Sequence, residues 1–195
     1  MTRDAEYTRR LLREQGSRWK RLLDVQAPYR WNLRRLRPGS TLEVGCGVGR
    51  NLSHLRGTGV GIDHNPHSVA ACRQTGLVAF TPEEFRGSEH DAAGRFDSLL
   101  LSHVAEHMRF GEFVQLVREY LPLLEPAGRI IVMTPQEAGF RSDPTHVEFF
   151  DLAKIRAALD QVGFFPTLEY SFPFPRFVGR IFPYNEFVSV SRRRN

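Results

Sequence analysis

Two short segments in the first half of the chain carry residue types suited to binding a nucleoside. The first, LEVGCGVGRN at residues 42–51, runs from an apolar strand through a glycine-rich turn toward a helix. In an open α/β sheet, nucleotides bind at the carboxyl end of the first strand, and glycines let the backbone approach the ligand closely. The second segment, VGID, ends in Asp63, a carboxylate placed to accept hydrogen bonds from two ribose hydroxyls. Together the two segments predict a nucleoside site.

The spacing of the glycines and the acid before them indicate which kind of nucleoside binds. A dinucleotide site has the pattern GxGxxG, in which the pyrophosphate lies at the N-terminus of the following helix. Here the pattern is GxGxG, and Glu43 precedes Gly45 by two residues. A carboxylate at this position would repel a pyrophosphate, but it suits a ligand with a cationic end, such as the amino group and sulfonium of S-adenosylmethionine. A nicotinamide-dependent dehydrogenase is therefore disfavoured.

With these residues the chain resembles the class I S-adenosylmethionine-dependent methyltransferases, and the resemblance spans roughly residues 40–165. Four segments carry it: EVGCGVGRN, GIDHNP, FDSLLLSHVAEHM and LPLLEPAGRIIVMTP. The resemblance implies a methyltransferase with S-adenosylmethionine as its cofactor. It also implies roles for six residues: the methionine part would be lined by Glu43, Gly45 and Gly47, the ribose bound by Asp63, and the sulfur underlain by Ser102 and His103.

Two further cofactor contacts follow from the resemblance. Family members often place an acid after the third strand to receive the adenine amino group, and Glu83 is the candidate here. It can equally be a carboxylate in the first turn of a helix that begins after Thr81. Helices that precede the first strand often close the cofactor pocket, which assigns Arg30 to the methionine carboxylate. Its neighbour Trp31 is expected to pack in the core.

The string HVAEH, which begins at His103, matches the HxxEH signature of an inverted zinc peptidase. That signature needs the middle of a regular helix, whereas this copy begins at the end of a predicted strand, so a zinc peptidase is disfavoured. A related hypothesis stays open. His103, Glu106 and His107 can join Asp143 and His146 around a divalent cation or an acceptor hydroxyl. A cation, such as Mg²⁺, is expected near His103, Glu106 and Asp143.

Methyl transfer to oxygen is an in-line displacement, so an enzyme must hold the acceptor in line and remove its proton. An imidazole is the side chain whose ordinary pKa suits that proton transfer near neutral pH. His146 follows the predicted fifth strand, at the edge where the acceptor is expected, and is the predicted general base. Asp143 can orient its ring or bind a cation. The alternative is that both residues only cap the helix predicted over residues 151–162.

The second half of the chain also resembles a narrower group, the small actinobacterial sugar O-methyltransferases. The segments TPQEAGFRSDPTHVEFFD and SFPFPRFVGRIFPYNEFV are similar to the mycobacterial 1-O-methyltransferase that acts on 3-O-methylated mannosides in methylmannose polysaccharide biosynthesis. This implies a sugar hydroxyl as the acceptor and an oligosaccharide as the partner. Aromatic rings can pack on sugar faces and polar groups can bind hydroxyls; the candidates are Phe172, Phe174, Phe177, Tyr184, His107, Arg141, Arg176 and Glu186. The alternatives are a small aromatic or lipid-like alcohol as acceptor, and a non-catalytic nucleoside-binding protein.

The elements that must position these residues are predicted from apolar patterning. Short apolar runs bounded by glycine or polar turns predict five buried strands, at residues 41–44, 60–63, 77–80, 96–102 and 129–134. Helical spacing predicts helices at residues 51–56, 66–75, 110–124 and 151–162. Strands at residues 166–172 and 186–191 are predicted to form an antiparallel C-terminal hairpin. The alternation predicts an α/β fold: a doubly wound, mostly parallel seven-stranded sheet with helices on both faces.

Length and composition set the class of protein. The chain has 195 residues, 41% of them hydrophobic, and we expect residues 1–38 to form a helical extension and residues 39–195 the S-adenosylmethionine-binding domain. No run approaches the roughly 20 apolar residues of a membrane-spanning helix, and no signal peptide is evident, so a soluble, cytoplasmic protein is predicted. Cys46 and Cys72 form no CxxC pattern and are expected to be reduced.

The charge of the chain is unevenly distributed. The net charge is +5, yet the first 40 residues hold 11 basic and 4 acidic side chains, and residues 192–194 are all arginine. A nucleic-acid binder more often carries its positive charge on a folded face than on an arm and a tail, so nucleic acid is disfavoured as a partner. The aromatic C-terminal segment would suit a homodimer if its rings are exposed.

Overall fold

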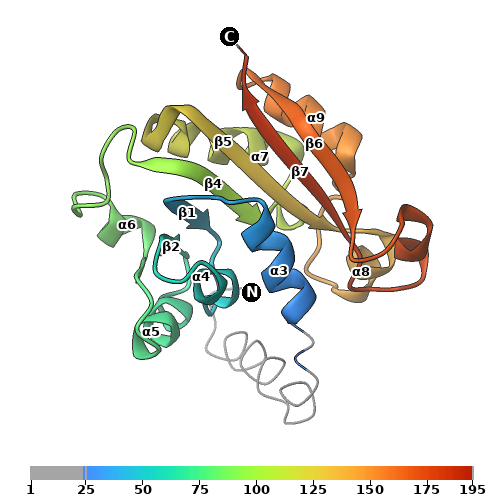
Figure 1. Cartoon of the computed structure of the whole chain (residues 1–195), viewed down its shortest axis with the longest axis horizontal. Helices are drawn as coiled ribbons and strands as arrows, with labels where there is room; N and C mark the ends of the chain where they lie inside the picture. Colours follow the sequence, from blue (N-terminus) through green and yellow to red (C-terminus); the bar gives the residue numbers. More distant parts are fainter. Residues whose placement is uncertain (1–23, 25, 195) are drawn as a thin grey trace. The chain divides into compact units, whose positions relative to one another are not determined.

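The computed structural model describes residue 24 and residues 26–194, and it divides into two compact units at Asp91 and Ala92. Seven strands form a mixed sheet in the order β3-β2-β1-β4-β5-β7-β6, drawn as arrows in Figure 1. The predicted α/β fold with an antiparallel C-terminal hairpin is confirmed. Most of the predicted extension, residues 1–38, lies outside the described residues, and its described end forms helix α3 (Ala27–Arg35).

The first unit, up to Asp91, contains three parallel strands joined by helical crossovers. Its strands are β1 (Thr41–Val44), β2 (Gly59–Ile62) and β3 (Ala79–Phe80), and its helices after α3 are α4 (Arg50–His54), α5 (Pro66–Gln74) and α6 (Pro82–Phe85). Strands β1 and β2 pair in register, with Thr41 opposite Gly59. Helix α5 begins where the Asn65 side chain accepts a hydrogen bond from the His67 amide, a standard N-cap. These crossovers place the ends of β1 and β2 at the same edge.

The second unit, from Ala92 on, contains four strands. They are β4 (Phe96–Ser102), β5 (Leu124–Pro135), β6 (Phe164–Phe172) and β7 (Glu186–Arg193). Strand β4 pairs with β5 in parallel, while β7 is antiparallel to both β5 and β6. The helices of this unit are η1 (Ala105–His107), α7 (Phe110–Tyr120), η2 (Leu121–Leu123), α8 (Glu137–Ser142), α9 (Leu152–Asp160) and η3 (Arg176–Arg180). Figure 1 shows α8 where β5 ends, beside the loop that carries η3.

The core of the second unit lies between its strands and the helices α7 and α9. Leu99, Leu100 and Leu101 of β4 are at most 1% exposed, and so are the isoleucines of β5. Helix α9 buries Ile155 and Leu159, two members of the predicted apolar stripe, and contacts α7, β6 and β7. Each fully buried leucine or isoleucine side chain contributes roughly 1.5–3 kcal/mol to stability. This packing fixes β4 and β5, from whose ends the candidate site residues extend.

Two expectations about aromatic residues need correction. Trp31 does not pack in the core, because its side chain is 57% exposed and lies under the guanidinium of Arg35, 4.8 Å from the ring centroid. Phe172, proposed as a sugar-stacking ring, is instead 8% exposed at the end of β6. Both cysteines are free and buried. No helix among the described residues is long and apolar enough to cross a membrane.

Candidate active site

The glycine-rich turn of the first unit links β1 to α4 and is built on left-handed backbone. Gly47 has φ +54° and Gly49 φ +79°, a region that side-chain-bearing residues rarely adopt. At Gly49 a Cβ atom would also lie 2.4 Å from Cδ1 of Leu77, so a larger residue would collide there. The amide of Gly47 donates a 2.8 Å hydrogen bond to Oδ2 of Asp63, which fastens the turn to the end of β2.

Asp63 is 7% exposed and uses both carboxylate oxygens within the chain. Its Oδ2 accepts from Gly47, and its Oδ1 accepts a 2.8 Å hydrogen bond from the amide of Asn65. A carboxylate has about four acceptor sites, so each oxygen keeps a lone pair for a further donor. The structure thus places Asp63 beside the glycine-rich turn, as predicted, in a fixed orientation.

Glu43 lies in the middle of β1 and is 2% exposed. Its Oε1 accepts a 2.7 Å hydrogen bond from the side-chain amide of Asn51, while Oε2 has no hydrogen-bond partner among the described residues. Burial raises the pKa of this carboxyl to about 7, although the hydrogen bond from Asn51 acts in the opposite direction. A buried carboxylate oxygen with an open acceptor site attracts a cation or a hydrogen-bond donor.

The two remaining cofactor candidates of the first unit are Glu83 and Arg30. Glu83 is exposed in the first turn of α6, but the capping role falls to Glu84, which completes a capping box with Thr81. Arg30 in α3 donates to both carboxylate oxygens of Asp24. Arg30 is therefore held in an exposed ion pair and would have to leave it to bind another carboxylate.

In the second unit, β4 ends in a strained residue that bridges two carboxylates. Ser102 is buried, and His103 follows it with φ +57°, a left-handed conformation that is unusual for histidine. The ring of His103 contacts Oε1 of Glu106 through Nδ1 at 3.2 Å and Oε1 of Glu186 through Nε2 at 2.8 Å. Burial alone would lower the pKa of His103, but the two carboxylates outweigh it and raise the pKa to about 9. His103 is therefore an imidazolium between two acids near neutral pH.

The partners of His103 change two assignments made from the sequence. The sequence assigns Glu186 to acceptor hydroxyls. In the structure Glu186, at the start of β7, is 6% exposed and bonds to His103, which lies 83 residues earlier in the chain. Among the predicted cation ligands, His103 contacts Glu106, but both of its ring nitrogens face carboxylates, so it offers no nitrogen to a cation. Asp143 accepts from the amide and hydroxyl of Thr145, at 2.9 and 2.7 Å.

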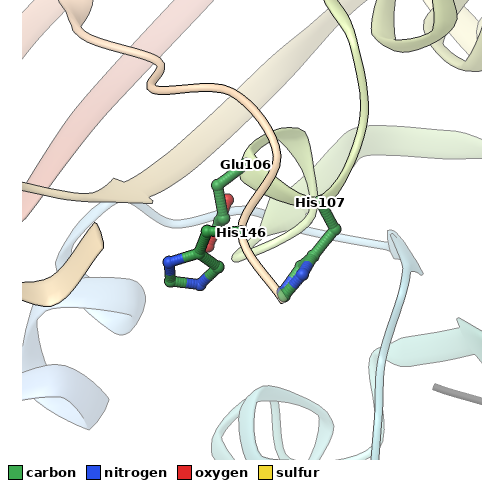
Figure 2. Close-up of side chains that lie close together, drawn as sticks. All are labelled: Glu106, His107 and His146. Atoms are coloured by element: carbon green, nitrogen blue, oxygen red, sulfur yellow. The ribbon is translucent and has the colours of Figure 1, made fainter. Parts of the chain in front are cut away.

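The structure instead groups Glu106 with two histidines (Figure 2). Glu106 and His107 come from η1, and His146 comes from the loop after α8; one potential ligand atom of each lies within 4.8 Å of the others. The backbone carbonyl of Glu106 accepts hydrogen bonds from the amides of Val147 and Glu148, at 2.7 and 3.2 Å. These bonds hold the loop against η1 and bring the two imidazole rings to a centroid distance of 4.9 Å.

The ring of His146 is oriented by Phe140 rather than by Asp143, which corrects the sequence prediction. Its Nδ1 lies 2.7 Å from the backbone carbonyl of Phe140, and its ring stacks on the Phe140 ring at 5.3 Å. A carbonyl only accepts, so in the neutral ring Nδ1 carries the proton and Nε2 has the free lone pair. The alternative that His146 and Asp143 cap the following helix is also wrong, since Asp151 caps α9 through the amide of Lys154.

The aromatic segment between β6 and β7 is partly open to solvent. Phe174, Phe177 and Tyr184 are 47%, 71% and 61% exposed, so a ligand can reach part of each ring. Arg176 pairs with Glu137 of α8. Arg141, in turn, donates a 3.0 Å hydrogen bond to the carbonyl of Arg180. These two contacts fasten the aromatic segment to α8, the helix that also carries Phe140.

Comparison with known proteins identifies the family. The model of a family described as "Methyltransferase domain" matches residues 11–167, most of the chain. The chain belongs to this methyltransferase family. A search of curated proteins found no match. The enzyme is thus a methyltransferase, and the glycine-rich turn, Asp63 and the histidine cluster all lie within the matched residues.

Solved structures with the same fold are also methyltransferases. A SAM-dependent methyltransferase from Archaeoglobus fulgidus superposes with a TM-score of 0.71 at 16% identity, covering 97% of this chain and 100% of the other. Magnesium protoporphyrin IX methyltransferase from Synechocystis PCC 6803, with bound SAM, gives 0.65 at 15% identity and covers 99% and 93%. The 1,6-didemethyltoxoflavin-N1-methyltransferase of Burkholderia thailandensis, with its substrate and S-adenosylhomocysteine bound, gives 0.60 at 16% identity and covers 97% and 90%. At these identities the likeness establishes the fold.

Proposed function

We propose that this methyltransferase transfers the methyl group of S-adenosylmethionine to a hydroxyl oxygen of a small sugar acceptor, with His146 as the general base. The observation that carries the choice of oxygen is the ring of His146, whose Nδ1 is held by the Phe140 carbonyl so that Nε2 is left to accept a proton. A hydroxyl is a weak nucleophile until its proton is removed, whereas an amine does not need such a base. A fixed imidazole lone pair supplies that function.

The first unit supplies the cofactor contacts in this proposal. The open Oε2 of Glu43 suits the ammonium group of the methionine part, and the backbone of Gly45 and Gly47 suits its close approach. The remaining lone pairs of Asp63 suit the ribose hydroxyls. Glu83 stays the candidate for the adenine amino group and Arg30 for the methionine carboxylate.

The second unit supplies the acceptor contacts. The acceptor oxygen attacks the methyl carbon in line with the carbon–sulfur bond. The oxygen–carbon bond forms as the carbon–sulfur bond breaks, the hydroxyl proton passes to Nε2 of His146, and the sulfonium becomes the neutral thioether of S-adenosylhomocysteine. The exposed rings of Phe177 and Tyr184 can pack on the apolar face of a sugar. The choice of a mannoside, such as the 1-hydroxyl of a 3-O-methylated oligomannoside, rests on the resemblance of the second half of the chain to sugar O-methyltransferases. A small aromatic or lipid-like alcohol is the competing acceptor.

Two measurements test this proposal. Titration with S-adenosylhomocysteine is expected to give micromolar binding, about 8 kcal/mol, that Asp63→Ala weakens at least about tenfold. A methyl-transfer assay is then run with 3-O-methylated mannosides, unmethylated mannosides, phenols and fatty alcohols. His146→Ala is expected to lower turnover by roughly 10²–10⁴-fold without changing affinity for S-adenosylhomocysteine, while the exposed His67→Ala serves as control. Near-normal turnover in His146→Ala would refute the role of base, and transfer only to phenols would refute the sugar.

A further inference from the structure

We propose that Glu106, His107 and His146 form a binding site for one divalent ion of the zinc class. Each residue offers one ligand atom, and the three atoms lie within 4.8 Å of one another. Zinc binds imidazole nitrogen and carboxylate oxygen at roughly 2.0–2.2 Å, so an ion placed between these three atoms would draw them closer together. Figure 2 shows the Glu106 side chain against the ring of His146, with His107 facing them.

The buried carboxylate of Glu106 provides a second, independent indication of a ligand. Glu106 is fully buried, and its Oε1 is taken by His103. Its Oε2 has no hydrogen-bond partner within residues 26–194. An unpaired, buried carboxylate oxygen is costly, and a metal ion is one of the few groups that offset that cost fully. The bond from His103 also fixes the direction in which the other oxygen points.

Both histidines are held in the way that metal-binding histidines are held. The Nδ1 of His146 lies 2.7 Å from the Phe140 carbonyl, and the Nδ1 of His107 lies 3.3 Å from the Thr145 carbonyl. A ligating histidine almost always donates its other ring N–H to a carbonyl or carboxylate, which leaves the remaining nitrogen as the ligand. In both residues that nitrogen is Nε2. Backbone hydrogen bonds between Glu106 and the loop after His146 keep the three side chains on one small frame.

The donor set decides the class of ion. Two imidazoles and one carboxylate suit Zn²⁺, Co²⁺ or Mn²⁺ and leave coordination positions open. Magnesium demands oxygen ligands in near-octahedral geometry, so the Mg²⁺ expected from the sequence does not fit this cluster. The other oxygen donor predicted for a cation, Asp143, already accepts hydrogen bonds from Thr145. The zinc class therefore follows from the side chains themselves.

Occupancy of this site has a consequence that rests on the proposed function. The Nε2 atom of His146 cannot bind a metal and accept the acceptor proton at the same time. The ion and the proton therefore compete for His146, and the metal-bound enzyme does not transfer methyl groups.

The experiment uses the full chain without an affinity tag, after treatment with a chelator. Titration with ZnCl₂ is expected to show one ion bound per chain, and CoCl₂ is expected to give visible absorption bands of a four- or five-coordinate ion. His107→Gln and His146→Gln are each expected to weaken Zn²⁺ binding at least about tenfold, whereas His67→Gln binds as the parent does. Binding of more than one ion, or wild-type affinity in His107→Gln, would overturn the site. The Co²⁺ spectrum of the parent tests the ligand set even if a variant does not fold.

Activity measurements separate this inference from the proposed function. Each variant's methyl-transfer rate with Zn²⁺ is compared with its own metal-free rate. Zn²⁺ is expected to inhibit the parent, and His107→Gln is expected to need at least about tenfold more Zn²⁺ for the same inhibition. If one Zn²⁺ binds and His146→Ala keeps its turnover, the metal site stands and the general base fails. If His146→Ala loses turnover and no Zn²⁺ binds, the general base stands and the metal site fails.

Discussion

Replacement of Glu43 by glutamine is expected to stabilise the cofactor-free protein at alkaline pH. Burial raises the pKa of this carboxyl from 4.5 to about 7, so the folded state holds the Glu43 proton more tightly than the unfolded state. Its contribution to stability is complete below pH 4.5 and is lost as pH rises through 7. At about 1.4 kcal/mol for each unit of the pKa shift, the charged form lowers the free energy of unfolding by on the order of 3 kcal/mol. Glutamine carries no charge and avoids this cost at every pH.

The gain in Glu43→Gln should be somewhat smaller than the full cost. Glutamine keeps an oxygen for the Asn51 amide, but it places an NH₂ group where Oε2 has no partner among the described residues. An unsatisfied buried donor costs roughly 1–3 kcal/mol. We therefore expect the variant to gain up to about 2 kcal/mol over the parent at pH 8. At pH 5, where Glu43 of the folded state is protonated, only the cost of the NH₂ group remains, and the variant is expected to lose roughly 1–2 kcal/mol.

Urea unfolding at pH 5 and pH 8 measures this difference directly. Other titrating groups are common to parent and variant, so they cancel in the comparison. The exposed Glu125→Gln is the matched control and is expected to leave the free energy of unfolding within about 0.5 kcal/mol of the parent at both pH values. A stability change in Glu43→Gln that is equal at pH 5 and pH 8, or a loss at pH 8, would refute the account of Glu43 as a penalised charge. The same variant is expected to bind S-adenosylhomocysteine at least about tenfold more weakly.

Two further changes probe the packing of each unit. Burial, reinforced by nearby arginines, lowers the pKa of His54 to about 4, so stability should fall by about 2 kcal/mol as pH drops from 6.5 to 4. His54→Leu should remove that acid loss and the exposed His67→Leu should not, as read from urea unfolding across pH. A Cβ atom on Gly179 would lie 1.7 Å from the side-chain oxygen of Gln136, so Gly179→Ala is expected to lose about 2–4 kcal/mol. Gly111→Ala, with no atom within 4 Å in a helix, should instead gain up to about 1 kcal/mol; equal melting temperatures for the two variants would contradict this account.

Local patterning predicted most of the fold because strands such as β1 and β4 are short apolar runs with clear ends. The first and fourth strands were predicted at residues 41–44 and 96–102, and the structure has β1 and β4 there. The ends of the predicted helices were less accurate. The helix predicted over residues 110–124 ends at Tyr120, because Pro122 interrupts the α-helical hydrogen bonds and a 3₁₀ turn takes over.

The contacts within the candidate site were harder to predict. Some join residues that are far apart in the sequence, and others involve a backbone carbonyl, which no residue type marks. The sequence predicted that Asp63 lies beside the glycine-rich turn, because the two follow adjacent parallel strands. The pairing of His103 with Glu186 depends on how β7 returns to the sheet, which no local spacing encodes. The orientation of His146 depends on the backbone carbonyl of Phe140, and every residue has such a carbonyl. The contact of Asn51 with Glu43 could have been predicted, since Asn51 is the second residue of the helix that follows the glycine-rich turn.

The left-handed backbone of His103 has an evolutionary consequence. A non-glycine residue at φ +57° costs about 1–2 kcal/mol, which glycine at the same position would avoid. Glycine would also leave Glu106 and Glu186 as buried acids without a cation between them, which is a larger loss. Glycine at position 103 is therefore not tolerated while both acids remain, so positions 103, 106 and 186 should covary across homologous chains. Lineages with glycine at position 103 are expected to carry neutral residues at both acidic positions.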